Sequence, residues 1–276
     1  MKGEHQAVSR RIITGFSNPT VKFLRSLRDK KHRRREGRFL AEGLRLLTDA
    51  RECGKLPEML IMATGRETHP LLTALEADVV AAGGEVIEMD EDILAKVTGK
   101  ENPQAVAGVF AEFDTGLSSL DRSSARIWLV AQALRDPGNL GTMLRTGDAV
   151  GAGGLILIDD CADPFSVEAV RASMGAIFTQ HVAQARWPDF IEWLRQGEGQ
   201  LVAASLRNAQ DYRQAPYVGP CFILVGNESR GLPEDYEDAC DLRVTIPMLG
   251  RADSLNAAVA GAVLAYEALA HIGIAE

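Results

Sequence analysis

Three polar segments of the chain each follow an apolar run and carry side chains suited to binding or chemistry. The segment after residues 127–134 holds Asn139 and Arg145, and the segment after residues 221–226 holds Glu228. The segment after residues 242–248 holds Ser254 and Asn256. A guanidinium presents a planar fork of donors that suits phosphate, and a helix that begins at a strand end is an anion site by default. The first segment therefore indicates an anion-binding site.

Each of these residues also has a simpler, structural interpretation. Arg145 can be an exposed helix arginine, and Glu228 can be a surface carboxylate. Ser254 is a good N-cap for the last helix, with Asn256 in its first turn. One segment alone does not decide between these structural interpretations and a binding or catalytic site.

The elements that must position these residues are short apolar runs that alternate with helical stretches. Because continuous apolar strands that alternate with helices are typical of a parallel sheet covered on both faces, we expect such a sheet here. Ligands of open α/β sheets bind beyond the carboxyl ends of the strands, which is where the three segments lie. The expected strands are residues 127–134, 154–159, 201–206, 221–226 and 242–248.

The first part of the chain has the pattern of a small, separate α/β unit. We expect a helix over residues 18–27 with Asn18 as its cap, and a second helix over 39–53. Short apolar strands and one more helix follow, and a polar, Ser-rich linker occupies 114–126. The predicted division is a basic arm or helix, a small α/β domain, the linker and the large α/β domain, at residues 1–36, 37–113, 114–126 and 127–276.

Charge is distributed unevenly along the chain. Residues 1–38 carry twelve Lys and Arg but three acidic residues, a net +9, whereas the whole chain carries −8, which leaves −17 for the remainder. A basic arm on an acidic body suggests a polyanion met at one end. The alternative is that these cations lie on a basic helix that faces solvent and binds no polyanion.

Composition and motifs exclude several classes of protein. No apolar run approaches the ~20 residues of a membrane span, and the N-terminus has no apolar core of a secretory signal, so we expect a cytoplasmic protein without a membrane partner. The four cysteines are far apart, which predicts neither a metal site nor disulfides. Phosphate-loop and dinucleotide fingerprints are missing, as are the hydrolase motifs.

Taken together and in this order, the three segments resemble the SpoU-type (TrmH-like) RNA ribose 2′-O-methyltransferases of the SPOUT superfamily. The matching stretches are "DPGNLGTMLRTGDAVGAGGLIL", "ILVGNESRGLP" and "VTIPMLGRADSLNAAVAGAVLAYE". "NPTVKFLRSL" and "RREGRFLAEGLRLL" resemble the N-terminal substrate-binding domain of ribosomal-RNA members. The resemblance implies a deep trefoil knot in the C-terminal sheet, a small N-terminal RNA-binding domain, and a homodimer formed through the C-terminal domain.

The resemblance also implies roles for individual residues. Arg145, Asn139, Glu228, Ser254 and Asn256 match the catalytic positions of the family. The cofactor, S-adenosyl-L-methionine, is expected at Leu224, Gly226, Asn227, Ile246, Met248, Ser254 and Leu255, held largely by backbone. RNA is expected at Lys30, Lys31, Arg33, Arg34, Arg35 and Arg145.

The expected activity is methyl transfer to a ribose 2′-hydroxyl in structured RNA, with 23S ribosomal RNA as the expected substrate. A transfer-RNA methyltransferase and a non-catalytic RNA-binding or ribosome-assembly factor on the same fold are the alternatives. In this family, the arginine that matches Arg145 is regarded as the base that removes the hydroxyl proton. An arginine side chain, however, stays protonated in proteins. We therefore expect Arg145 to grip the phosphate beside the target ribose, while the proton leaves to that phosphate, to water or to a perturbed Arg145.

Overall fold

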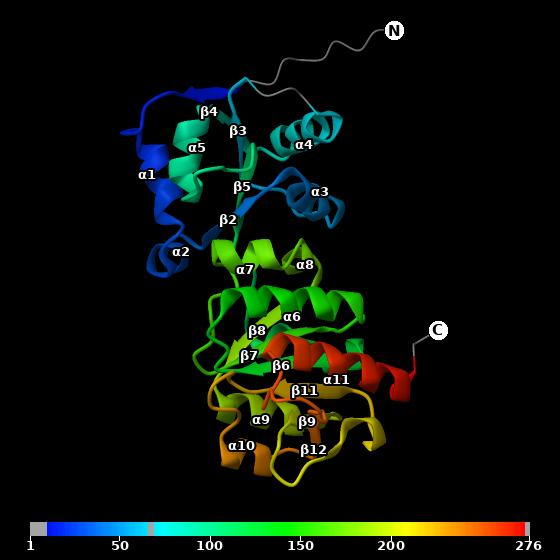
Figure 1. Ribbon diagram of the computed structural model, residues 1–276. Helices are drawn as coiled ribbons and strands as arrows, with labels where there is room; N and C mark the ends of the chain where they lie inside the picture. The colour runs from blue at the N-terminus through cyan, green and yellow to red at the C-terminus, as the bar shows by residue number, and fades with distance from the viewer. Residues whose placement is uncertain (1–9, 66–68, 274–276) are drawn as a thin grey trace. The chain divides into compact units, whose positions relative to one another are not determined.

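A computed structural model describes residues 10–65 and 69–273, which divide into two compact units (Figure 1). Unit 1 comprises residues 1–113 together with Phe165–Arg171, and unit 2 comprises residues 114–164 and 172–276. Residues 1–9 of the expected basic arm lie outside the described residues. Of the helices described, none combines the length and apolar character that crossing a membrane requires.

Unit 1 is built on a mixed sheet with the strand order β1-β4-β3-β5-β2, in which β1, β4 and β3 run parallel and β5 pairs antiparallel with β3 and β2. The helices α1 and α5 pack against each other, as do α3 and α4. The strands are β1 (Arg11–Ile13), β2 (Arg38–Glu42), β3 (Met59–Ala63), β4 (Glu85–Met89) and β5 (Val106–Ala111). The helices are α1 (Pro19–Ser26), α2 (Lys30–Glu36), α3 (Leu44–Glu52), α4 (Pro70–Ala81) and α5 (Glu91–Thr98).

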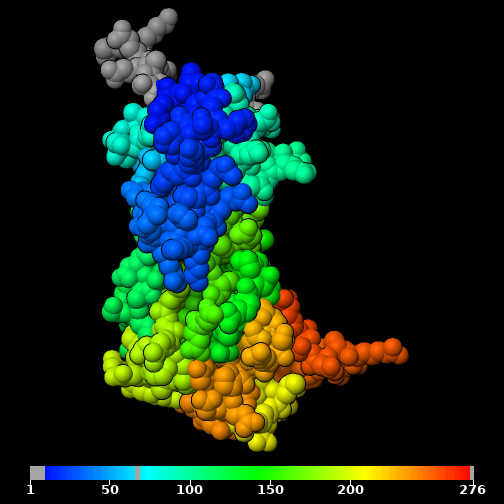
Figure 2. Space-filling model, turned by 90° about the vertical axis from the view of Figure 1, so that its left-hand side faces the viewer, coloured from blue at the N-terminus to red at the C-terminus, as the bar shows by residue number. Residues whose placement is uncertain are grey.

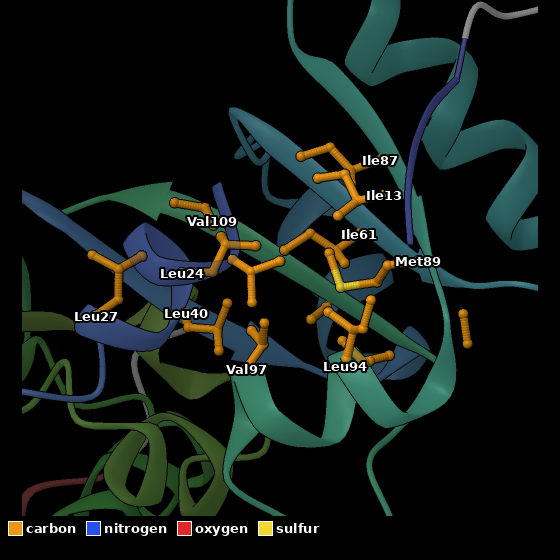
Figure 3. Close-up of a cluster of buried hydrophobic side chains, with 14 of the residues drawn as sticks. Ile13, Leu24, Leu27, Leu40, Ile61, Ile87, Met89, Leu94, Val97 and Val109 are labelled. Carbon is orange, nitrogen blue, oxygen red and sulfur yellow. The ribbon is translucent and has the colours of Figure 1, made fainter. Parts of the chain in front are cut away.

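The core of unit 1 includes the chain that we expected to form a separate basic arm. Ile13 of β1 and Leu24 of α1 lie among Ile87, Leu94 and Val97 in one buried cluster (Figure 3). Asn18 caps α1, as predicted, because its side chain accepts a hydrogen bond from the backbone of Thr20. Residues 11–36 are therefore an integral part of unit 1, because their apolar side chains fill its core.

The predicted helix over residues 39–53 is wrong in its first half. Arg38–Glu42 forms β2, whose register with β5 buries Phe39 and Leu40, and α3 begins only at Leu44. Gly43 has a φ of +107°, which ends the strand and turns the chain into the helix. The apolar spacing of Leu40 and Leu44 fitted a helix because a buried strand followed by a helix can mimic that spacing.

Unit 2 is a seven-stranded sheet in which every pairing is parallel, with the order β10-β12-β9-β11-β6-β7-β8. This confirms the predicted sheet, to which the structure adds β8 and the short β10. The strands are β6 (Ile127–Gln132), β7 (Gly154–Ile158), β8 (His181–Ala185), β9 (Gln200–Ala204), β10 (Gln210–Asp211), β11 (Cys221–Val225) and β12 (Leu242–Thr245).

Helices cover both faces of this sheet (Figure 1). On one face α6 and α11 pack against each other and on β6 and β11. On the other face α9 places Phe190 and Leu194 in a cluster with Trp128 and Phe222 of the strands. The helices of unit 2 are α6 (Pro137–Ala149), α8 (Ala176–Thr179), α9 (Trp187–Arg195), α10 (Glu234–Asp238) and α11 (Ala257–Ile272), whereas α7 (Val167–Ala172) lies in unit 1 except for its last residue.

The polar segment that we expected to be a linker is folded onto unit 2. It forms two short 3₁₀ turns, Leu117–Ser119 and Arg122–Ser124. The Arg122 guanidinium lies over the Trp193 ring and donates to the carbonyl of Leu194 at 2.9 Å. These contacts fix the chain at the point where it enters unit 2.

Candidate active site

The first site loop is fixed by the start of α6, directly beyond β6. Asp136 is the N-cap of this helix, because its Oδ1 accepts a hydrogen bond from the backbone N–H of Asn139 at 2.6 Å. The cap leaves the half-buried side chain of Asn139 free to bridge to other loops.

Asn139 joins the other two predicted loops through its side-chain amide. Its Nδ2 donates to Oε1 of Glu228 at 2.8 Å, and its Oδ1 accepts from Nδ2 of Asn256 at 2.9 Å. Residues 89 and 117 positions away in the sequence thus meet at one side chain. The structure therefore brings three of the five predicted catalytic residues into one hydrogen-bonded chain, which we call the Glu228–Asn139–Asn256 chain.

Asn256, and not Ser254, caps the last helix. Its Oδ1 accepts from the backbone N–H groups of Ala258 and Val259, at 2.9 and 3.3 Å. The prediction that Ser254 is the cap was wrong, because the helix begins two residues later than the pattern of small residues indicated. With its oxygen directed to the helix, the Asn256 amide is oriented so that its nitrogen faces Asn139.

The loop after β11 is shaped by Asn227 and carries Glu228 to the edge of the sheet. Asn227 Nδ2 donates to the carbonyl of Ala133 at 2.9 Å, which ties this loop to the one after β6. Its Oδ1 accepts from the backbone N–H groups of Ser229 and Arg230. The carboxylate of Glu228 is exposed and is held next to the N-terminal end of α6, where the helix dipole favours a negative charge.

A cavity of about 450 Å³ lies between the loops that follow β9, β11 and β12. This volume is within the ~300–1,000 Å³ usual for small-molecule sites. Leu224 does not line it, because its side chain is fully buried in the sheet core among Trp128 and Phe222. The other six residues expected at the cofactor do line it, namely Gly226, Asn227, Ile246, Met248, Ser254 and Leu255.

Gly226 shows that backbone forms one wall of this cavity. A Cβ at this position would lie 2.6 Å from the carbonyl carbon of Gly231 and 2.7 Å from the nitrogen of Leu232. Only glycine allows the end of β11 and the returning loop to pass so closely. Gly231 itself has a φ of +68°, a backbone conformation that favours glycine.

Sequence reasoning missed the loop after β9, which supplies polar groups to the same cavity. Glu237 is buried and accepts from Oγ of Ser205 at 2.5 Å and from Nε of Arg207 at 2.9 Å. The hydrogen bond to Glu237 raises the pKa of Arg207, so its guanidinium keeps its charge. Because this loop also follows a parallel strand, the strand-end rule that located the other three loops would have found it.

Arg145 lies apart from the Glu228–Asn139–Asn256 chain. It is exposed on α6, six residues after Asn139, which places it about 9 Å along the axis and about 240° around the helix. Within the described residues its side chain makes no hydrogen bond or ion pair. Glu228 accepts a hydrogen bond from Asn139 and, within the described residues, none from Arg145.

The basic residues of α2, which were expected to bind RNA, differ in their accessibility. Arg33 is buried, and its Nη1 donates to the carbonyls of Leu27 and Arg28 at 2.8 Å. Its expected RNA contact is therefore wrong, because the side chain is used to join α2 to the end of α1. The exposed or half-buried members of the set are Lys30, Lys31, Arg34 and Arg35.

The cavity suits a cofactor that is part nucleoside and part amino acid. Apolar side chains and backbone from the β11 and β12 loops line one part, and Ser205, Arg207 and Glu237 supply polar groups. The close backbone approach at Gly226 provides a cradle that a side chain would fill. In residues 10–65 and 69–273, no group of three or more His, Cys, Asp or Glu side chains is arranged to hold a metal ion.

Two family models match this chain. Residues 126–266 match the SpoU rRNA Methylase family, and residues 18–108 match the MRM3-like substrate binding domain. The 23S rRNA (guanosine(2553)-2′-O)-methyltransferase RlmP of Bacillus subtilis is 32% identical over 92% of this chain and 97% of its own. The 23S rRNA (uridine(2479)-2′-O)-methyltransferase of Streptomyces viridochromogenes is 31% identical over 97% of this chain and 94% of its own.

Solved structures agree with these matches over both units. The AdoMet-bound rRNA methyltransferase from Sinorhizobium meliloti has a TM-score of 0.89 and 39% identity, covering 96% of this chain and 99% of its own. The SpoU methyltransferase AviRb from Streptomyces viridochromogenes, in complex with AdoMet, has a TM-score of 0.83 and 30% identity, covering 92% and 97%. The chain therefore belongs to the SpoU rRNA methylase family.

Proposed function

We propose that this protein transfers a methyl group from S-adenosyl-L-methionine to a ribose 2′-hydroxyl of 23S ribosomal RNA. The observation that carries the proposal is the Glu228–Asn139–Asn256 chain, which joins three loops at the edge of a nucleoside-sized cavity. Two relatives that match nearly the whole chain bear names of 23S rRNA 2′-O-methyltransferases, which supports the substrate class. Such a substrate implies action in the cytoplasm, where ribosomes assemble.

The cofactor would be held in the cavity of unit 2. Backbone at Gly226, Ile246 and Leu255 would surround it, while Ser205 and the Arg207–Glu237 pair supply polar contacts. When bound, S-adenosyl-L-methionine supplies an electrophilic methyl group. No metal is needed for that chemistry, because the leaving group is a neutral thioether.

In this proposal the chain's own residues position the RNA. Asn139 fixes Glu228 by an amide hydrogen bond and is itself oriented by Asn256, so the Glu228 carboxylate is available to accept a hydrogen bond from a ribose hydroxyl. Arg145 grips the phosphate beside the target ribose through its guanidinium fork. The hydroxyl proton leaves to that phosphate or to water, because an arginine side chain stays protonated in proteins.

The position of Arg145 supports a homodimer formed through unit 2. Arg145 projects about 240° around α6 from Asn139, so it faces away from the Glu228–Asn139–Asn256 chain of its own subunit. We infer that it reaches the site of a second copy. Exposed Val259 and Tyr266 on the neighbouring α11 would join that interface. The face of α11 that carries small residues packs internally, since Gly261 lies against Met143 and Val225.

Mixing two inactive variants tests the dimer and the role of Arg145 together. Arg145→Ala and Asn139→Ala should each lose turnover as homodimers while retaining affinity for S-adenosylmethionine. Mixed dimers should recover about a quarter to a half of wild-type activity, because one site then holds both native residues. If the mixture stays inactive, Arg145 works within its own subunit; if Arg145→Ala alone keeps full turnover, the assigned role is wrong.

A transfer-RNA substrate is the second candidate, because several partial relatives are named putative tRNA/rRNA methyltransferases. Those relatives cover 57–62% of this chain, whereas the 23S rRNA enzymes match nearly all of it, unit 1 included. Mapping 2′-O-methyl sites in cells with and without the protein separates the two substrates. Loss of a site in transfer RNA alone would overturn the ribosomal assignment.

A further inference from the structure

A basic groove in unit 1 lies outside the helix that the sequence marked for RNA binding. It consists of two shallow hollows of about 510 Å³ each, one between α1 and α5 and one along α1 and the turn into α2, and both are lined by Arg25 and Arg28. Figure 2 views the molecule from the side on which α1 lies, in blue. We call this basic surface the α1–α5 groove. The cationic residues that line it are Lys22, Arg25, Arg28, Lys96 and Lys100.

Most of these cations lack a fixed acidic partner. Within the described residues, the side chains of Lys22, Arg25 and Arg28 make no ion pair, whereas Lys100 lies 4.0 Å from Glu42. Three acids also line the groove, but Asp29 is used internally, since its Oδ1 caps α2. The other two are Asp92 and Glu101. The groove therefore presents a surplus of uncompensated positive charge.

The Arg28 guanidinium has a defined position in the groove. A Cβ at Gly99 would lie 2.2 Å from its guanidinium carbon, so the guanidinium rests directly on the glycine that ends α5. The C-terminal end of a helix favours a cation. This contact holds the guanidinium in place without neutralising it, and its donors are left for a ligand.

An exposed aromatic ring completes the groove. Phe16 is 50% exposed although it is a large apolar residue, and it lines the groove together with Lys96, whose Nζ is 5.9 Å from the ring centroid. Phe16 is the only phenylalanine with a large exposed fraction in the described chain. An exposed ring beside cations is the arrangement with which proteins stack an unpaired base and hold the flanking phosphates.

We propose that the α1–α5 groove binds an unpaired stretch of the RNA substrate, with one splayed base stacked on Phe16 and adjacent phosphates held by Arg25 and Arg28. This inference rests on the proposed function and adds to it a second contact surface, which recognises a loop or bulge and not a duplex. An acidic peptide would satisfy the cations, but it would leave the exposed ring without a stacking partner.

The test measures the affinity of the full-length protein for 23S rRNA fragments across a salt series. Phe16→Ala should weaken binding about five- to 150-fold, and Phe16→Leu should weaken it similarly, because leucine keeps apolar area but cannot stack. Phe16→Trp should bind at least as well as the wild type. Arg25→Gln should reduce the slope of log affinity against log salt by about 0.7. None of these changes should alter affinity for S-adenosylmethionine.

Two matched variants on α3 and α4 serve as controls. Leu71 is an apolar residue of comparable exposure, 44%, and Arg45 is an exposed arginine, so Leu71→Ala and Arg45→Gln should bind RNA as the wild type does. Equal RNA affinity of Phe16→Ala and the wild type overturns the groove while leaving the methyltransferase assignment in place. Equal loss in Phe16→Leu and Leu71→Ala also overturns it. Absence of methylation by the wild type would instead count against the proposed function.

Discussion

Asn139 is the side chain on which the candidate site depends, because its amide bonds a carboxylate on one loop and an amide on another. A hydrogen bond to a charged group contributes about 1.5–3 kcal/mol. We therefore predict that Asn139→Ala lowers kcat/KM by about 10- to 150-fold with little change in cofactor affinity, measured by turnover and by calorimetry.

Thr142, on the next turn of α6, provides the control for Asn139→Ala. Its hydroxyl donates to the carbonyl of Gly138 within the helix and makes no hydrogen bond to another loop in the described residues. Thr142→Ala should keep wild-type turnover. If both variants lose activity to the same extent, the stability of α6 matters and not the bridge that Asn139 makes.

The four cysteines should differ in reactivity according to their burial. Burial raises the pKa of Cys161 to about 11 and the pKa values of Cys221 and Cys240 to about 12. Cys53 is exposed. Because the thiolate is the reactive form, a thiol reagent at pH 8 should modify one cysteine rapidly in the folded protein and four in denaturant. More than one rapid equivalent in the folded protein would contradict this assignment.

At this scale the sequence predicted residue types better than their local roles. Asn139, Glu228 and Asn256 were identifiable because each follows a strand of a parallel sheet. The sequence could not predict that Asn256, and not Ser254, caps α11, since serine and asparagine cap helices equally well. The burial of Arg33 was also hidden, because a run of cations does not show which one points inward.

Gly226 sets the geometry of β11 and its loop, the element that forms a wall of the cavity. Gly226→Ala would drive a Cβ into the backbone of Gly231 and Leu232, which cannot move as a side chain can. We predict at least tenfold weaker binding of S-adenosylmethionine and a lower melting temperature. Gly250, in the loop after β12, has open space around it, so Gly250→Ala should leave both quantities unchanged. Equal cofactor affinity and equal melting temperature of the two variants would contradict the role of Gly226 in forming the cavity wall.

The strands of unit 2 were predictable because each is a continuous apolar run, as expected for a sheet buried on both faces. The β8 strand was missed because its sequence, HVAQA, is a short apolar stretch interrupted by the exposed polar residues His181 and Gln184 at the sheet edge. The β2 strand was mistaken for helix because strand and helix follow each other with only Gly43 between them.

At the scale of the whole molecule, the second half of the sequence contributes a segment to unit 1. Phe165 packs against Phe39 and Phe113, and Arg171 donates to the buried carboxylate of Glu42 at 2.8 Å. No local pattern predicts this, because the contact spans 129 residues. The threading of the C-terminal segment is a similar property, and the trefoil knot stays a prediction.

The Arg171–Glu42 pair makes the stability of unit 1 depend on this distant segment. Glu42 has a side chain that is 1% exposed, so Arg171→Gln leaves its charge buried with only Lys100 at 4.0 Å. We predict a loss of about 2–3 kcal/mol in the free energy of unfolding and faster amide exchange in β2. Arg186→Gln, which removes an exposed pair at 3.9 Å with Asp189, should cost less than about 0.5 kcal/mol. Unchanged exchange in β2 would contradict the role of the pair.

The most direct test of the assigned activity is methylation of purified 23S rRNA with labelled S-adenosylmethionine, followed by digestion to nucleosides. We predict that label is recovered in a single 2′-O-methyl nucleoside and that Asn139→Ala and Arg145→Ala lose most of it while still binding the cofactor. Label on a base instead of a ribose, or no label under conditions in which the cofactor is bound, would contradict the account.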